Sequence, residues 1–75
     1  MQLSDVLIHL DQAINETEKE NIIEQLRAVD GVIAPRFNKD REHLLLVSYN
    51  SDRVDSLVLL NEVRDQGYQA QLVGL

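Results

Sequence analysis

The chain has 75 residues, no cysteine and a formal net charge of −6 at pH 7. This length suits one small domain, and the lack of thiols excludes disulfides and every metal site built on cysteine. The acidity repels phosphate backbones and anionic lipid headgroups, so we expect neither a nucleic acid nor a membrane as partner. The segment Met1–Leu10 has no signal-peptide pattern, and no apolar stretch approaches the ~20 residues of a membrane span. We therefore expect a cytoplasmic protein.

The first predicted elements are a strand and the start of a helix. Val6–Leu10 is short, apolar and ends at polar residues, which predicts a strand. Two overlapping capping boxes follow, in which a polar cap precedes an acid by three residues. One pairs Asn15 with Glu18, and the other pairs Thr17 with Glu20. Either one predicts that a helix begins here.

This helix continues along one apolar face to about Val29 and is followed by a second strand. The face consists of Ile22, Ile23, Leu26 and Val29. Gly31 ends the helix because glycine accepts the left-handed conformation that helix ends favour. Val32–Phe37 then predicts a strand. Its Pro35 has no amide hydrogen for a ladder bond, so we expect this strand at a sheet edge.

The second half repeats the pattern with a strand, a helix and a strand. Leu44–Tyr49 is a nearly continuous apolar run, typical of a central strand. Residues 55–66 predict a helix that Gly67 ends, and Tyr68–Val73 predicts the last strand. The inward residues of this helix are Leu59, Leu60 and Val63.

The order of elements, βαββαβ, predicts an α+β fold of the ferredoxin-like type. We expect one domain over residues 1–75, with a four-stranded antiparallel sheet in the order 4-1-3-2 and both helices on one face.

Several core and cap residues match one known family. They are Gly31-Val32, Phe37, Leu45-x-Val47-x-Tyr49-Asn50, Val54, Leu59-Leu60, Val63 and Gly67-Tyr68-x-Ala70-x-Leu72-Val73. On these residues the chain resembles the heavy-metal-associated domain family of small copper chaperones, mercury-binding proteins and amino-terminal domains of metal-pumping ATPases. The resemblance covers nearly the whole chain and implies the same βαββαβ fold.

The resemblance also implies a metal-binding loop whose ligands are missing here. The family binds metal with a Met-x-Cys-x-x-Cys loop between the first strand and the first helix. Counted back from Gly31, its methionine falls at Ala13 and its cysteines fall at Asn15 and Glu18. An amide and a carboxylate cannot replace the two thiolates that bind Cu(I). We therefore expect a degenerate member of the family in which the metal loop has become a helix cap.

A metal site of carboxylates and histidine is one alternative. Asp11, Glu16, Glu18 and His43 are expected at the same end of the fold, and such ligands suit zinc, nickel or manganese as a bound divalent ion. Acids at a helix start are equally explained by the helix dipole. A histidine beside a turn is most simply solvated, and no His-x-x-x-His spacing supports the site.

The open face of the sheet is the other candidate site. If the buried residues of the first and third strands alternate regularly, Leu7, His9, Leu44 and Leu46 all point away from the helices. These strands are neighbours in the predicted order, so the four residues form an apolar patch, and such patches usually mark interaction sites. The expected partner is another protein or a second copy of the chain. Scattered outward leucines, or a register shifted by one residue, would remove the patch.

No pattern of an enzyme occurs in the sequence. It contains no Ser-His-Asp arrangement, glycine-rich phosphate loop or catalytic histidine pair. We predict a non-enzymatic interaction module without a resident cofactor, accessory to metal homeostasis. Metal binding through the carboxylates and histidine is the alternative. Sensing of a small ligand is a third possibility, for which no residue selects a metabolite.

Overall fold

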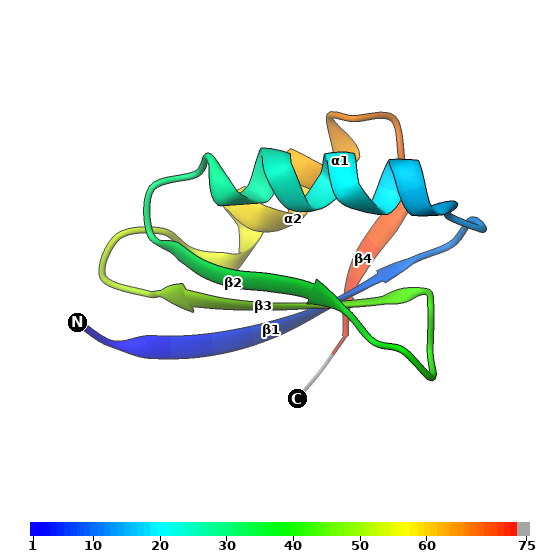
Figure 1. Ribbon diagram of the computed structural model, residues 1–75. Helices are drawn as coiled ribbons and strands as arrows, with labels where there is room; N and C mark the ends of the chain where they lie inside the picture. Colours follow the sequence, from blue (N-terminus) through cyan, green and yellow to red (C-terminus); the bar gives the residue numbers. More distant parts are fainter. Residues whose placement is uncertain (74–75) are drawn as a thin grey trace.

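The computed structural model describes residues 1–73 and shows the predicted order of elements (Figure 1). The elements are β1 (Leu3–Leu10), α1 (Glu16–Arg27), β2 (Val32–Phe37), β3 (Leu44–Asn50), α2 (Ser56–Arg64) and β4 (Ala70–Val73). The strands pair antiparallel in the order β2-β3-β1-β4, which is the predicted order. Strand β2, which contains Pro35, lies at an edge, as predicted.

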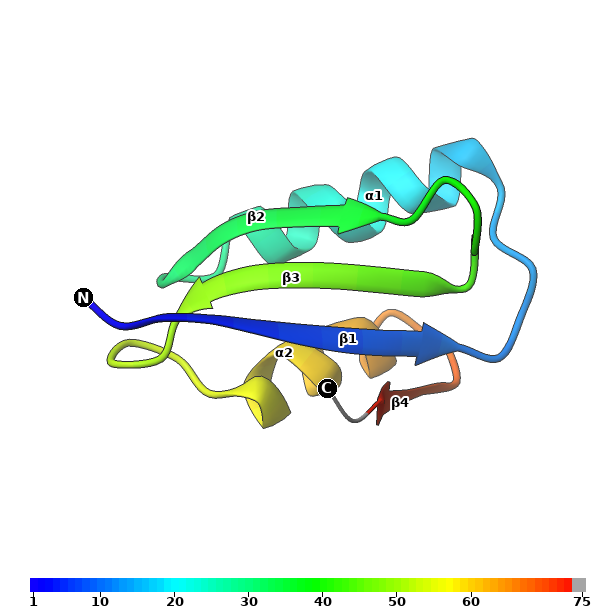
Figure 2. The same cartoon turned by 90° about the horizontal axis from the view of Figure 1, so that it is seen from below.

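The two helices form a single layer on one side of the sheet. Figure 1 shows α1 and α2 above the strands. Figure 2 views the molecule from below, with the sheet in front of both helices. No helix among residues 1–73 has the length and apolar character needed to cross a membrane.

The strands differ slightly from their predicted bounds. β1 begins at Leu3 rather than Val6, because Leu3 still pairs with Asn50 of β3 beyond the apolar run. β4 begins at Ala70 rather than Tyr68. The apolar pattern of the sequence therefore located the strand centres, and backbone pairing sets the strand ends.

Both helices end two residues earlier than predicted. α1 ends at Arg27 and α2 at Arg64, each followed by one capping residue in a right-handed conformation. Gly31 and Gly67 adopt the predicted left-handed conformation, with φ of +100° and +97°, but each lies in the turn after its helix and not at the helix end itself. Glycine adopts these angles without the steric cost that a Cβ brings.

The core lies between the sheet and the helices. The inward residues of β1 and β3 alternate with outward ones, as predicted, and the helices close over them. The buried side chains at its centre are Val6, Ile8, Leu10, Ile22, Leu26, Leu45, Val47, Leu59, Leu60 and Val63. Complete burial of one such side chain contributes about 1.5–3 kcal/mol. This core holds β1 and α1 in a fixed relation, and the loop between them is the first candidate site.

Candidate functional site

The start of α1 is a complete capping box. The amide of Glu18 donates to Asn15 Oδ1 at 2.8 Å, and the amide of Asn15 donates to Glu18 Oε1 at 3.1 Å. Of the two predicted boxes the structure uses the first, and Thr17 lies inside the first turn of the helix. The two positions where the resemblance implies thiolates therefore bind each other.

A second set of hydrogen bonds ties this loop to the α2–β4 loop. Tyr68 Oη donates to Glu18 Oε2 at 3.1 Å. The Asp11 amide donates to the Gln69 carbonyl at 2.9 Å, and the Gln69 amide donates to Gln12 Oε1 at 2.7 Å. Burial, together with the hydrogen bond and the negative charge of Glu18, raises the pKa of Tyr68 above its ordinary value of 10.0. Glu18 thus uses both carboxylate oxygens to hold the loop closed.

Sequence reasoning did not identify Tyr68 as part of this site. Its partner Glu18 lies 50 positions away, and no local pattern links the two residues. The position of Tyr68 directly after the helix-ending Gly67 was the available signal, because it places the ring at the end of the sheet where α1 begins.

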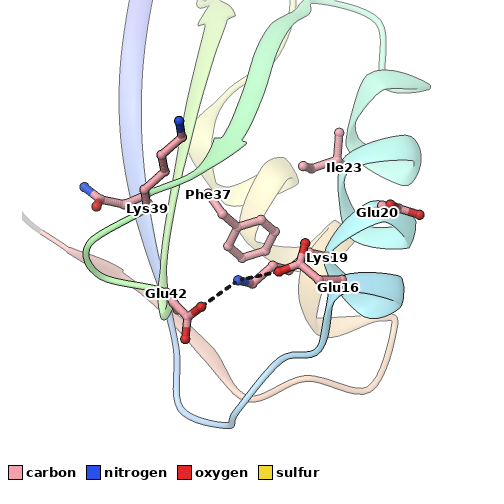
Figure 3. A pocket seen from close by; sticks show the side chains of 8 residues that line it. Glu16, Lys19, Glu20, Ile23, Phe37, Lys39 and Glu42 are labelled. Carbon is pink, nitrogen blue, oxygen red and sulfur yellow. Dashed lines mark hydrogen bonds and ion pairs between the residues drawn. The ribbon is translucent and has the colours of Figure 1, made fainter.

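The predicted metal ligand Glu16 belongs to a different contact, with Lys19. Lys19 is only 9% exposed, and its Nζ lies 3.5 Å from Glu16 Oε1 and 3.4 Å from Glu42 Oε1. The same nitrogen lies 5.6 Å from the centre of the Phe37 ring (Figure 3). The lysine therefore bridges α1 and the β2–β3 hairpin. Its position three and seven residues before Ile22 and Leu26 puts it on the apolar face of α1, and this spacing was the available signal.

The other two predicted ligands also have partners of their own. Asp11 Oδ1 lies 3.1 Å from His9 Nδ1, and His43 Nδ1 lies 2.9 Å from the Leu10 carbonyl oxygen. Within residues 1–73, no three His, Asp or Glu side chains gather closely enough to hold a metal ion. The structure therefore does not bring together the four predicted ligands Asp11, Glu16, Glu18 and His43.

The open face of the sheet carries the four residues of the predicted patch. Leu7 lies directly opposite Leu46, and His9 lies opposite Leu44. All four side chains are half-buried, while their neighbours along each strand are buried under the helices. Val73 of β4 pairs with Leu7 and extends the row. We call these five residues the sheet-face patch, and its role as an interface stays a prediction.

Two charged residues flank the sheet-face patch. Arg36 of the edge strand β2 pairs with Leu46, on one side of the patch. Asp5 of β1 pairs with Ser48, further along the strands, and accepts a hydrogen bond from the serine hydroxyl at 2.6 Å. The face is therefore apolar at its centre, with one base and one acid at its margin.

Comparison with known proteins gives structural matches. No family model and no curated protein sequence matches the chain. Oxidized MerP from Ralstonia metallidurans CH34 superposes with a TM-score of 0.82 and 13% identity, over 95% of this chain and 97% of MerP. The CopZ metallochaperone gives 0.82 and 20%, over 91% of this chain and all of CopZ (100%).

A third solved structure is the N-terminal domain of a potential copper-translocating P-type ATPase from Bacillus subtilis in its Cu(I)-loaded state. It superposes with a TM-score of 0.83 and 20% identity, over 95% of this chain and 88% of that domain. Identities this low show a shared fold. The chain therefore has the fold of the heavy-metal-associated domains, and it carries that fold without a cysteine.

Proposed function

We propose that this chain is a degenerate, non-enzymatic member of the heavy-metal-associated domains, accessory to metal homeostasis. In this proposal it acts by pairing with a second copy through the sheet-face patch and does not bind metal through thiolates. The carrying observation is the pairing of Leu7 with Leu46 and of His9 with Leu44, at the centre of a face that no described helix covers. The metal setting is supported by the CopZ metallochaperone and the Cu(I)-loaded domain of a potential copper-translocating ATPase, which share the fold.

The loss of the thiolates supports a role other than metal transfer. Asn15 and Glu18 satisfy backbone amides at the start of α1, and Glu18 also holds Tyr68. A soft ion such as Cu(I) needs sulfur ligands. With these positions committed to structure, the sheet-face patch remains as a candidate surface for contact with a partner.

The charge distribution favours a second copy as the partner. The net charge of −6 comes mainly from the helices and loops, whereas the outward strand positions of the described residues carry one acid, Asp5, and one base, Arg36. The face is therefore neutral and escapes the repulsion between two acidic chains. Arg36 and Asp5 lie on opposite sides of the patch, so one choice of twofold axis would pair Arg36 of one copy with Asp5 of the other, as in a self-complementary interface.

The size of the molecule is compatible with such a pair. Its two longer Cα extents are 33 and 23 Å. A face of this size offers about the 800 Å² per partner that a standard protein interface buries. Burial of half-exposed leucines at its centre would then stabilise the pair by the hydrophobic effect.

Sedimentation velocity over a wide concentration range, with a chelator present, tests this proposal. The wild type should shift towards a dimer as concentration rises. Leu46→Glu should weaken the association by more than about tenfold, equivalent to about 1.4 kcal/mol, because it places a charge in an apolar contact. The matched control is Leu57→Glu, since Leu57 is 59% exposed on α2.

Two results would overturn the proposal. One is a wild type that stays monomeric at the highest concentration, and the other is a Leu57→Glu variant that dissociates as much as Leu46→Glu. Thermal unfolding of each variant shows whether it remains folded.

A further inference from the structure

Two histidines from different segments lie side by side on the open face, where β1 ends and β3 begins. His9 is on β1, and His43 precedes β3, held there by the bond from the Leu10 amide to its carbonyl at 2.8 Å. Their ring centres are 5.9 Å apart, and the ring planes differ by 22°. Both rings line a surface hollow of about 550 Å³, together with Leu44 and Val73. Neither histidine belongs to the hydrophobic core, so packing of the core does not explain why the two imidazoles lie together.

The hydrogen bonds of both rings fix the same tautomer. His43 Nδ1 faces the Leu10 carbonyl at 2.9 Å, and a carbonyl oxygen only accepts, so Nδ1 carries the hydrogen. His9 Nδ1 faces the Asp11 carboxylate at 3.1 Å, and an ionised carboxylate also only accepts. In each neutral ring the lone pair is therefore on Nε2. Among residues 1–73 no hydrogen bond occupies either Nε2.

This arrangement is the one that metal-binding histidines adopt. Their second ring nitrogen generally donates to a carboxylate or a backbone carbonyl, which orients the ring and makes the metal-facing nitrogen more basic. Here Asp11 supplies the carboxylate for His9, and Leu10 supplies the carbonyl for His43. Asp11 thus supports a ligand instead of being one.

We propose that His9 and His43 bind one divalent transition-metal ion of the zinc, nickel or copper(II) class through their Nε2 atoms. Imidazole nitrogens suit these ions. Two imidazoles on one tetrahedral ion at about 2.0–2.1 Å place their ring centres roughly 5 Å apart. The two rings are stacked with their centres 5.9 Å apart, so both imidazoles must turn within their Nδ1 hydrogen bonds for the two Nε2 atoms to reach one ion. The remaining coordination positions are open to water or to an added ligand.

The charges around the hollow allow a cation to enter. Asp40 and Glu42 line it with negative charge, and Arg41 lines it with positive charge. The chain as a whole carries −6, which raises the local concentration of cations. The site is separate from the capping box at Asn15. It goes beyond the proposed self-association and shares His9, Leu44 and Val73 with the sheet-face patch, so zinc binding is measured on the dilute monomer.

Titration of the apo protein with zinc chloride, followed by calorimetry and by imidazole nitrogen NMR, tests this site. We expect calorimetry to give one zinc ion per chain. We also expect the Nε2 resonances of both histidines to shift while Nδ1 stays protonated. His9→Gln and His43→Gln should each weaken zinc binding by at least about tenfold. Loss of a group that only hydrogen-bonds to a metal ligand already weakens affinity by about 10–100-fold, and loss of a ligand should cost no less. Glu16→Gln is the matched control, because Glu16 is a strongly exposed acid outside the hollow.

The proposal is wrong if zinc leaves both Nε2 resonances unmoved, or if the histidine variants bind zinc as tightly as the wild type. It is also wrong if Glu16→Gln weakens binding as much as they do, because that result indicates general attraction to acids. The sedimentation experiment uses a chelator, so the two proposals fail independently of each other.

Discussion

Replacement of Asn15 by alanine tests whether this residue now has a structural role. The substitution removes Oδ1, the acceptor that holds the Glu18 amide at 2.8 Å. The backbone amide of Asn15 remains, so its bond to Glu18 Oε1 at 3.1 Å can persist. The change therefore removes one half of the capping box and leaves the other half in place.

The expected cost follows from the chemistry of helix caps. Loss of an asparagine cap to alanine lowers the free energy of unfolding by about 0.5–2 kcal/mol. This bond is exposed to solvent, so we expect about 1 kcal/mol. In a domain of 60–100 residues, 1 kcal/mol lowers the melting temperature by about 4–8 °C.

Thr17→Ala is the matched control, because the sequence offers Thr17 and Glu20 as an equivalent box that the structure does not use. Thr17 lies within the helix, where alanine has the higher propensity, so this variant should equal the wild type or gain up to about 0.5 kcal/mol. Urea unfolding followed by circular dichroism measures both variants. If Thr17→Ala loses as much stability as Asn15→Ala, the assignment of the cap is refuted.

The remaining predictions concern Tyr68 and the two glycines in the turns after the helices, Gly31 and Gly67. Because the folded-state pKa of Tyr68 is raised above 10.0, its contribution to stability is present below pH 10 and is lost as the pH rises through the folded value. Tyr68→Phe should lower stability at pH 8 and flatten this alkaline loss, and urea unfolding from pH 8 to pH 11 measures both. An unchanged alkaline profile would count against the Tyr68–Glu18 bond. Gly31→Ala should destabilise more than Gly67→Ala in thermal unfolding, because a Cβ at Gly31 would meet Arg53 Cβ at 2.8 Å and Val54 Cγ1 at 2.9 Å, whereas none lies within 4 Å at Gly67. Both variants bear the cost of positive φ, about 1–2 kcal/mol, and overpacking adds about 1–3 kcal/mol at Gly31. Equal losses would contradict the close packing at Gly31.

The fold was predictable because its signals are local. The period-two alternation of β1 and β3 set which side chains face the helices, and Pro35 set an edge strand. The left-handed turn after each helix is predicted from one glycine, Gly31 or Gly67. The placement of Leu7 and Leu46 on the same face of neighbouring strands followed from the same alternation and the order of elements, whereas their direct pairing comes from the structure.

The contacts between distant side chains were not predictable in this way. Glu16 and Glu18 were expected to face a common metal, but each has a closer partner, Lys19 and the capping box respectively. The pairing of His9 with His43 depends on the register of β1 against the start of β3, which no pattern in the sequence specifies. Side-chain partnerships across the fold require coordinates, even where the backbone topology does not.

Asn15 and Glu18 cap α1, and we propose that they stand where the heavy-metal-associated domains carry their thiolate ligands. Titration with Cu(I) against a chelator of known affinity tests it, with the wild type compared with a variant carrying both Asn15→Cys and Glu18→Cys. Thiolates at a helix start are favoured by the helix dipole and suit Cu(I), so the double variant should hold one Cu(I) ion per chain and the wild type should hold none. A wild type that retains Cu(I) as tightly as the folded double variant would contradict the claim.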